Sequence, residues 1–164
     1  MNSAIERLLT LRVSDFMSRD VVQVSACQTM GEAAAVFVQH RITGAPVTDE
    51  SGRCVGILSS VDFVRREQRR GDSAEDDLAQ REHQLTQDRP SEPFHIESVA
   101  EDSVQSHMTT AVQAIDEHES LLEAARMVCA EHVHRLPVVD EHGHVVGVVS
   151  SMDLVAAMIK ALEE

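Results

Sequence analysis

The sequence predicts an α/β fold built from two copies of one β-α-β-β-α unit. Residues 13–64 align without a gap with residues 104–155, which lie 91 positions further along the chain. Each copy also repeats the same order of strand-like and helix-like apolar patterns. Such a unit is too short to bury a secure core alone. We therefore expect the two copies to face each other as one body, with matching clefts along the seam.

The elements of each copy follow from local patterns. A short β run at residues 21–24 (112–115 in copy two) precedes a helix. Thr29 with Glu32, and Ser120 with Glu123, have the spacing of capping boxes at the start of that helix. Two strands follow, APVTD then CVGILS in copy one and LPVVD then VVGVVS in copy two, joined by turns that contain glycine. A second helix begins after SSVD and SSMD.

Four segments are predicted along the chain. Residues 1–12 form a leading helix, residues 13–65 the first copy, residues 66–103 a highly charged insert, and residues 104–160 the second copy. The insert is either a tether or helix without a binding role, or an element that docks a partner.

Composition excludes several classes of function. A formal net charge of −14 argues against a nucleic-acid binder, which needs clustered cations to displace counterions from phosphates. No apolar run is long enough to span a bilayer, and the first residues do not form a secretory leader. Three widely spaced cysteines without a CxxC pattern fit reduced thiols. These features predict a cytoplasmic protein that binds neither nucleic acid nor membrane.

Histidines are concentrated in the second copy, at His132, His134, His142 and His144. Such a set could ligate a metal. The alternative is a group of exposed turn histidines, and no acidic residue has the spacing of a known site.

The repeated pattern resembles a family. DFMSRDVVQV with QHRITGAPVTDESGRCVGILSSVDFV, and SHMTTAVQAI with EHVHRLPVVDEHGHVVGVVSSMDLV, are similar to two cystathionine-beta-synthase (CBS) domains in tandem. The resemblance implies two CBS repeats packed about a pseudo-twofold axis, often called a Bateman module. It also implies a homodimer that binds AMP, ADP, ATP or S-adenosylmethionine as a regulatory ligand between the repeats, with no obligatory cofactor.

The Ser-x-x-Asp motifs are the first candidate site residues. Ser59 and Ser150 stand where a strand ends and a helix begins, and helix N-termini favour phosphate. Asp62 and Asp153 can accept hydrogen bonds from a ribose diol. The alternative is that the serines cap the helices and the aspartates only favour the first turn.

The segments before each Pro-Val form the other predicted wall. In copy two, His134 and Arg135 can bind phosphate, whereas copy one has Thr43 and Gly44 at these positions. We therefore expect a phosphorylated ligand to prefer the cleft built from His134, Arg135, Ser150 and Asp153. Its base would lie on Ile42 and Ala33, with Thr43 nearby. The other cleft, with Val133, Ser59 and Asp62, suits a less anionic adenosyl group or is empty.

The sequence contains no nucleophile elbow, P-loop, HExxH motif or Gly-rich dinucleotide loop. The leading hypothesis is therefore a module, not an enzyme, that senses an adenosyl ligand and modulates a separate, unidentified protein. The alternatives are a ligand-independent dimerisation or protein-interaction module and a metal-binding stress protein.

Overall fold

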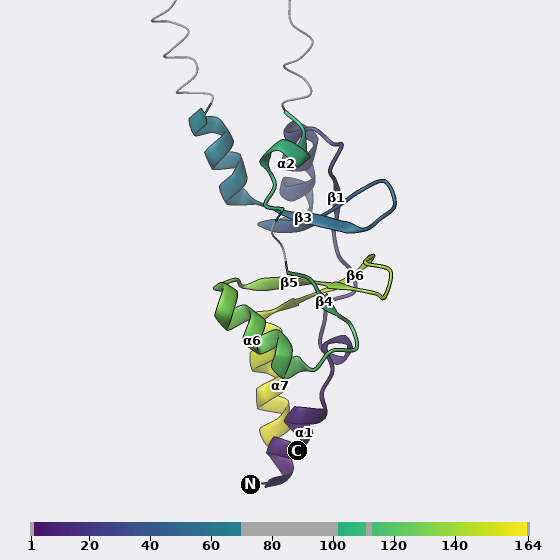
Figure 1. Ribbon diagram of the computed structural model, residues 1–164. Coiled ribbons are helices and arrows are strands. Elements are labelled where there is room, and N and C mark those ends of the chain that lie inside the picture. Colours follow the sequence, from purple (N-terminus) through teal and green to yellow (C-terminus); the bar gives the residue numbers. More distant parts are fainter. Residues whose placement is uncertain (1, 70–101, 111–112, 164) are drawn as a thin grey trace, which may run out of the picture.

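The computed structural model describes residues 2–69, 102–110 and 113–163. It contains two three-stranded sheets, in the orders β1-β2-β3 and β4-β5-β6. The sheets face each other across the middle of the molecule, and the helices lie outside them (Figure 1). This arrangement confirms the predicted α/β fold of two β-α-β-β-α units.

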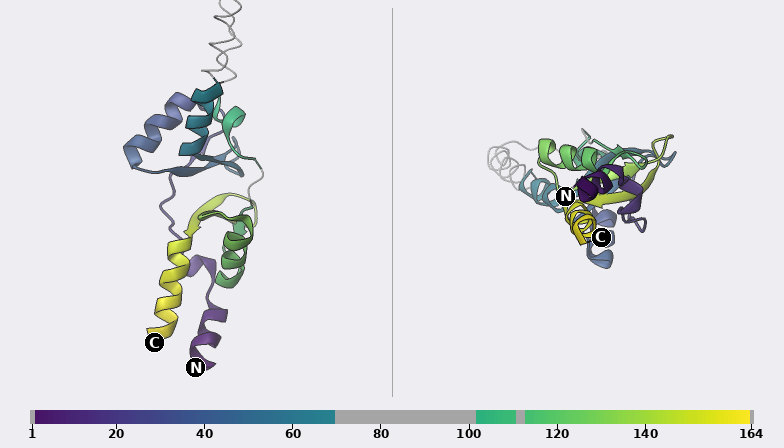
Figure 2. Two further views of the ribbon diagram at one scale, coloured as in Figure 1. Left: turned by 90° about the vertical axis from the view of Figure 1, so that its left-hand side faces the viewer. Right: turned by 90° about the horizontal axis from the view of Figure 1, so that it is seen from below.

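The first repeat contains β1 (Val24–Ser25), α2 (Met30–His40), β2 (Gly44–Thr48), β3 (Cys54–Ser59) and a helix over residues 60–69. The second contains β4 (Ile115–Asp116), α6 (Leu121–Glu131), β5 (Arg135–Val139), β6 (Val145–Ser150) and α7 (Ser151–Glu163). The described residues also form α1 (Asn2–Thr10), the 3₁₀ turn η1 (Val13–Asp15) and α5 (Val104–His107). Helix α1 packs against α6 and α7, so both ends of the chain lie at the same end of the molecule (Figure 2). In the described part of the chain, no helix is long and apolar enough to cross a membrane.

Each sheet combines one parallel and one antiparallel pair. β1 runs parallel to β2, with Val24 opposite Val47, and β2 pairs antiparallel with β3. The second sheet repeats this pattern. Because β1 and β2 are parallel, the residues that enter both strands lie at the same edge of the sheet, and this edge faces the seam.

The hairpin turns form as the glycines predict. Gly52 and Gly143 have φ values of 81° and 83°, in the left-handed region that favours glycine. Asp49 fixes its turn by accepting hydrogen bonds from the Ser51 hydroxyl at 2.6 Å and the Arg53 amide at 3.0 Å. These bonds stabilise the carboxylate and lower the pKa of Asp49.

Asp140 fixes the corresponding turn of the second repeat. Its carboxylate accepts from the amides of His144 and His142, each at 2.9 Å. These bonds lower the pKa of Asp140, with the His144 amide as the largest cause.

The predicted helix starts are also present. Thr29 and Glu32 form a reciprocal capping box, in which the Glu32 amide donates to the Thr29 hydroxyl and the Thr29 amide donates to the Glu32 carboxylate. At Ser120, the hydroxyl accepts from the Glu123 amide at 3.1 Å. Helices α2 and α6 are followed by the C-cap residues Arg41 and His132, whose φ values of 54° and 53° turn the chain toward β2 and β5.

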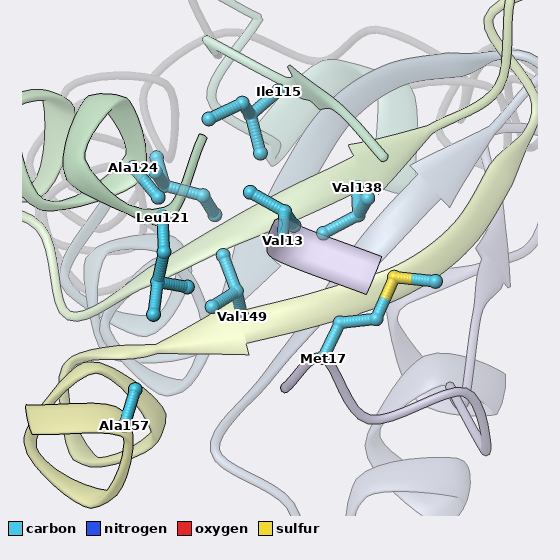
Figure 3. Packing of buried hydrophobic residues seen from close by; sticks show 9 residues of the cluster. Val13, Met17, Ile115, Leu121, Ala124, Val138, Val149 and Ala157 are labelled. Atoms are coloured by element: carbon cyan, nitrogen blue, oxygen red, sulfur yellow. The ribbon is translucent and has the colours of Figure 1, made fainter. Parts of the chain in front are cut away.

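The two hydrophobic cores exchange their leading segments. Val13 and Met17, which begin the first sequence copy, are buried in the core of the second repeat beside Ile115, Leu121 and Val138 (Figure 3). Reciprocally, Val104 is buried in the core of the first repeat and Met108 packs against it. The sequence repeat and the packing unit therefore do not coincide.

Backbone hydrogen bonds fix this exchange. Ser18 and Val148 bond to each other through both amides at 2.9 and 3.0 Å, and Thr109 and Ile57 do so at 2.9 and 3.0 Å. Each crossing segment passes directly over a strand glycine. A Cβ atom at Gly147 would lie 2.5 Å from the Met17 sulfur, and one at Gly56 would lie 2.8 Å from the Thr109 carbonyl oxygen.

The predicted charged insert is described only at its two ends, since residues 70–101 lie outside the described residues. Arg66 donates two hydrogen bonds to the Asp102 carboxylate, at 2.6 and 2.8 Å. The Asp102 carboxylate raises the pKa of Arg66, and the pair ties residues 60–69 to the segment that enters α5.

Candidate ligand clefts between the repeats

Two cavities lie along the seam. Cleft A has a volume of about 430 Å³ and cleft B about 290 Å³. Cleft A is lined by Thr43, Gly44, Ala45, Pro46, Ile57, Ser59, Ser60, Val61, Val133, His134, Arg135, Pro137 and Val148. Cleft B is lined by Ser18, Asp20, Val21, Val22, Ile42, Gly44, Pro46, Arg135, Val148, Ser150 and Asp153. Both repeats contribute to each cleft, so a molecule bound in either one would contact both.

The Ser-x-x-Asp motifs form helix starts in both repeats. Asp153 accepts hydrogen bonds from the amide and hydroxyl of Ser150, at 2.7 and 2.6 Å, both on Oδ2. Asp62 accepts the equivalent bonds from Ser59 at 2.7 and 2.8 Å. The serine and aspartate of each motif therefore bond to each other at the start of the helix, as the capping alternative predicts. Capping uses only one oxygen of each carboxylate, which leaves Oδ1 for a second role.

The two carboxylates differ in their access to the clefts. Asp62 is 4% exposed, does not line cleft A, and has Arg65 3.7 Å from its Oδ1. Asp153 is half-buried and lines cleft B. The residue three positions after Asp153 is Ala156, so α7 has no cation at the place of Arg65. The copies keep the same motif, but of the two carboxylates only that of Asp153 lines cleft A or cleft B.

Arg135 lines both clefts. It is the first residue of β5 and pairs in register with Ser150. Its guanidinium forms no hydrogen bond or ion pair within the described ranges 2–69, 102–110 and 113–163. Gly44 occupies the equivalent position on β2, opposite Ser59, and also lines both cavities.

The remaining predicted site residues are divided between the clefts. Ile42 joins Arg135, Ser150 and Asp153 in cleft B, as expected. His134 and Thr43, which were expected there, line cleft A instead, together with the expected Ser59 and Val133. His134 and Arg135 therefore share cleft A, and of the two only Arg135, the first residue of β5, also lines cleft B.

The structure does not place Ala33 at either cleft. Ala33 is fully buried in the core of the first repeat, beside Met30 and Phe37, and lines neither cleft. It lies on the inner face of α2, where its methyl group packs on the sheet and is not available to a ligand base.

Sequence reasoning missed the residues that enter β1. Ser18, Asp20, Val21 and Val22 line cleft B, although the valines were expected to form a strand. The strand begins only at Val24. The sequence pattern could have predicted their position, because a β-α-β unit with parallel strands brings the residues before β1 to the same edge as the residues before β2.

The histidines of the second repeat form no metal site in the described part of the chain, where no group of three or more His, Cys, Asp or Glu could hold an ion. The rings of His142 and His144 lie 6.0 Å apart, and Nδ1 of His144 is 3.2 Å from Asp140. These contacts belong to the hairpin turn.

Comparison with known proteins identifies the class. The family model of the CBS domain matches residues 13–69 and 102–160, and the chain belongs to this family. Its two CBS domains make it a CBS pair. The CBS domain-containing protein CBSX1, chloroplastic, of Arabidopsis thaliana is 29% identical over 162 residues, which cover 97% of this chain and 69% of that protein.

Solved structures of CBS pairs have the same fold. The structure of CBSX2 in complex with AMP has a TM-score of 0.66 at 24% identity, covering 93% of this chain and 98% of that one. The CBS domain pair of protein MJ0100, in complex with 5'-methylthioadenosine and S-adenosyl-L-methionine, has a TM-score of 0.65 at 23% identity, covering 94% and 99%.

Proposed function

We propose that this chain is a regulatory module that binds an adenosyl ligand, such as AMP, ADP, ATP or S-adenosylmethionine, and modulates a separate protein. Cleft B carries the proposal. There the half-buried Asp153, whose Oδ1 takes no part in the capping bonds, and Arg135, which has no side-chain partner among the described residues, line the same cavity. A carboxylate accepts hydrogen bonds from a ribose diol, and a guanidinium pairs with phosphate. The AMP and S-adenosylmethionine complexes of other CBS pairs support this choice of ligand class.

Regulation would follow from the position of the cleft. A ligand in cleft B contacts Ile42 of the first repeat and Asp153 of the second, so it favours the relative orientation of the repeats in which both contacts form. No catalytic step is needed, and we expect none. The expected result of binding is a change in the surface that the two repeats present to a partner.

Calorimetry with AMP tests the assignment, and the internal repeat supplies a matched control. Asp153→Asn should weaken AMP binding by about 10- to 100-fold, because it replaces the charged acceptor of the ribose hydroxyls. Asp62→Asn changes the equivalent capping contact outside both clefts, together with the Arg65 ion pair. It should therefore leave AMP affinity within about twofold. Equal losses in both variants would assign the effect to helix capping and contradict the site.

Thermal unfolding gives an independent measurement. AMP at about 100 times its dissociation constant should stabilise the native state by about 2.7 kcal/mol. For a domain of this size, that raises Tm by about 5–10 °C. The ligand-independent module predicts no change in Tm at any nucleotide concentration.

We also propose that the protein forms a homodimer through the exposed apolar residues of the last helix in each repeat, which are α7 and the helix over residues 60–69. Helix α7 exposes an apolar stripe at helical spacing, consisting of Met152, Val155, Ile159 and Leu162, which are 45% to 78% exposed. The helix over residues 60–69 exposes Val61 and Val64 at the equivalent place, at 52% and 58%. A pair of related apolar helices on one chain fits the same pair on a second copy about a twofold axis. Sedimentation velocity on the purified chain distinguishes the dimer from the monomer.

A further inference from the structure

Arg135 is one cation shared by two cavities. It lines cleft A and cleft B, whereas Gly44, its counterpart in the first repeat, contributes no charge to either. Among the described residues that line cleft B, Arg135 is the only Lys or Arg, and the lining also includes the carboxylates of Asp20 and Asp153. In cleft A it stands beside His134.

This arrangement limits how many phosphorylated ligands the two clefts can hold at the same time. A guanidinium that binds one phosphate through two parallel hydrogen bonds is largely neutralised by it. A second phosphate in the neighbouring cleft would then meet an anion at Arg135 instead of a free cation. With Arg135 engaged from cleft A, the remaining charges of cleft B are the carboxylates of Asp20 and Asp153, which repel phosphate.

We infer that the two clefts compete for Arg135, so that each chain binds one phosphorylated ligand and admits only an uncharged adenosyl ligand to the other cleft. The inference rests on the proposed function and adds a rule of occupancy to it. An uncharged nucleoside such as 5'-methylthioadenosine needs no cation, and the choice of ligand at one cleft therefore controls the charge of the ligand accepted at the other. The module would respond to the ratio of phosphorylated to uncharged adenosyl ligands.

The pseudo-symmetry provides a gain-of-function test. Gly44→Arg places a second guanidinium at a position that lines both clefts, and a Cβ atom at this position meets only the Leu58 carbonyl oxygen at 3.6 Å, an ordinary contact. Native mass spectrometry and calorimetry should count one AMP per wild-type chain and two per Gly44→Arg chain. Gly44→Gln, of similar length without the charge, should remain at one. Wild-type protein saturated with AMP should still take up 5'-methylthioadenosine.

Loss of the cation provides a second test that adds no side chain to the cleft. In wild-type protein we expect AMP to bind more tightly than 5'-methylthioadenosine, and Arg135→Gln should reduce this preference by about 10- to 100-fold. Two AMP molecules of similar affinity on the wild-type chain, or one AMP on a folded Gly44→Arg chain, would overturn the shared-cation rule while leaving the proposed function intact. Failure of the wild-type chain to bind either ligand would overturn both.

Discussion

Replacing Gly147 with alanine tests the exchange of segments between the two cores. Gly147 lies on β6 beneath the crossing segment, where Ser18 bonds to Val148. A Cβ atom at this position would lie 2.5 Å from the sulfur of Met17, 3.0 Å from its Cγ and 3.1 Å from the Ser18 carbonyl oxygen. Met17 is 8% exposed in the core of the second repeat, so its side chain has little free space into which it can move.

The expected cost is that of overpacking. An extra methyl group in a well-packed core costs about 1–3 kcal/mol. For a chain of this length, we expect Tm to fall by about 2–12 °C. Gly31→Ala is the matched control, because Gly31 is exposed in the first turn of α2 and its nearest neighbour, the Thr29 hydroxyl, would be 3.9 Å from the new methyl group. The control should be neutral or stabilising by up to about 1 kcal/mol, since alanine favours the helix.

Urea unfolding followed by circular dichroism measures both variants. In the Gly147→Ala background, Met17→Ala should recover some stability, because it relieves the clash with the new methyl group. If the leading segment is held by both contacts, this gain should be smaller than the stability that Met17→Ala loses in the wild-type background. More simply, an unfolding midpoint for Gly147→Ala equal to that of wild type would show that Met17 does not pack on β6. The exchange of leading segments would then be wrong.

Three further predictions concern turns, caps and assembly. Asp49 and Asp140 have lowered pKa values in the folded state, so the unfolded chain binds more protons in acid. The stability that the two carboxylates contribute is therefore complete above their ordinary pKa of 3.8 and is lost as pH falls through and below it. Urea midpoints measured from about pH 6 down to about pH 3 should fall less steeply in an Asp49→Asn, Asp140→Asn double variant than in wild type. Thr29→Ala removes a reciprocal capping box and should cost about 1 kcal/mol in unfolding free energy. Ile159→Glu places a charge on the exposed stripe of α7 and should shift sedimentation toward the monomer without lowering Tm of the monomer; an unchanged dimer would exclude this face.

Local patterns predicted the elements because each depends on neighbours in the sequence. The capping residue Thr29 and the turn glycines Gly52 and Gly143 act within a few positions of themselves, and the structure confirms all three. The repeat also predicted that Ser150 and Asp153 stand at a strand-to-helix junction.

The exchange of segments could not be predicted in the same way. Val13 and Met17 occupy the same repeat positions as Val104 and Met108, so either segment has the apolar residues to fill either core. Internal similarity therefore removes the information that would assign a segment to its own copy or to the other. The sequence also did not predict which cleft His134 lines, because that depends on the exact position at which the strand begins.

The exchanged segments also determine what would happen to half of this protein. A chain carrying only one repeat would lack the helix that completes its core and would expose the apolar groove in which Val104 or Val13 is buried. The nearest source of the missing segment would be a second identical chain, so such a half should associate by swapping segments and its stability should depend on concentration. Joining both copies in one polypeptide replaces that encounter between molecules with an intramolecular one, at a fixed effective concentration. The duplication thus removes the concentration dependence that segment swapping between chains would impose on the fold.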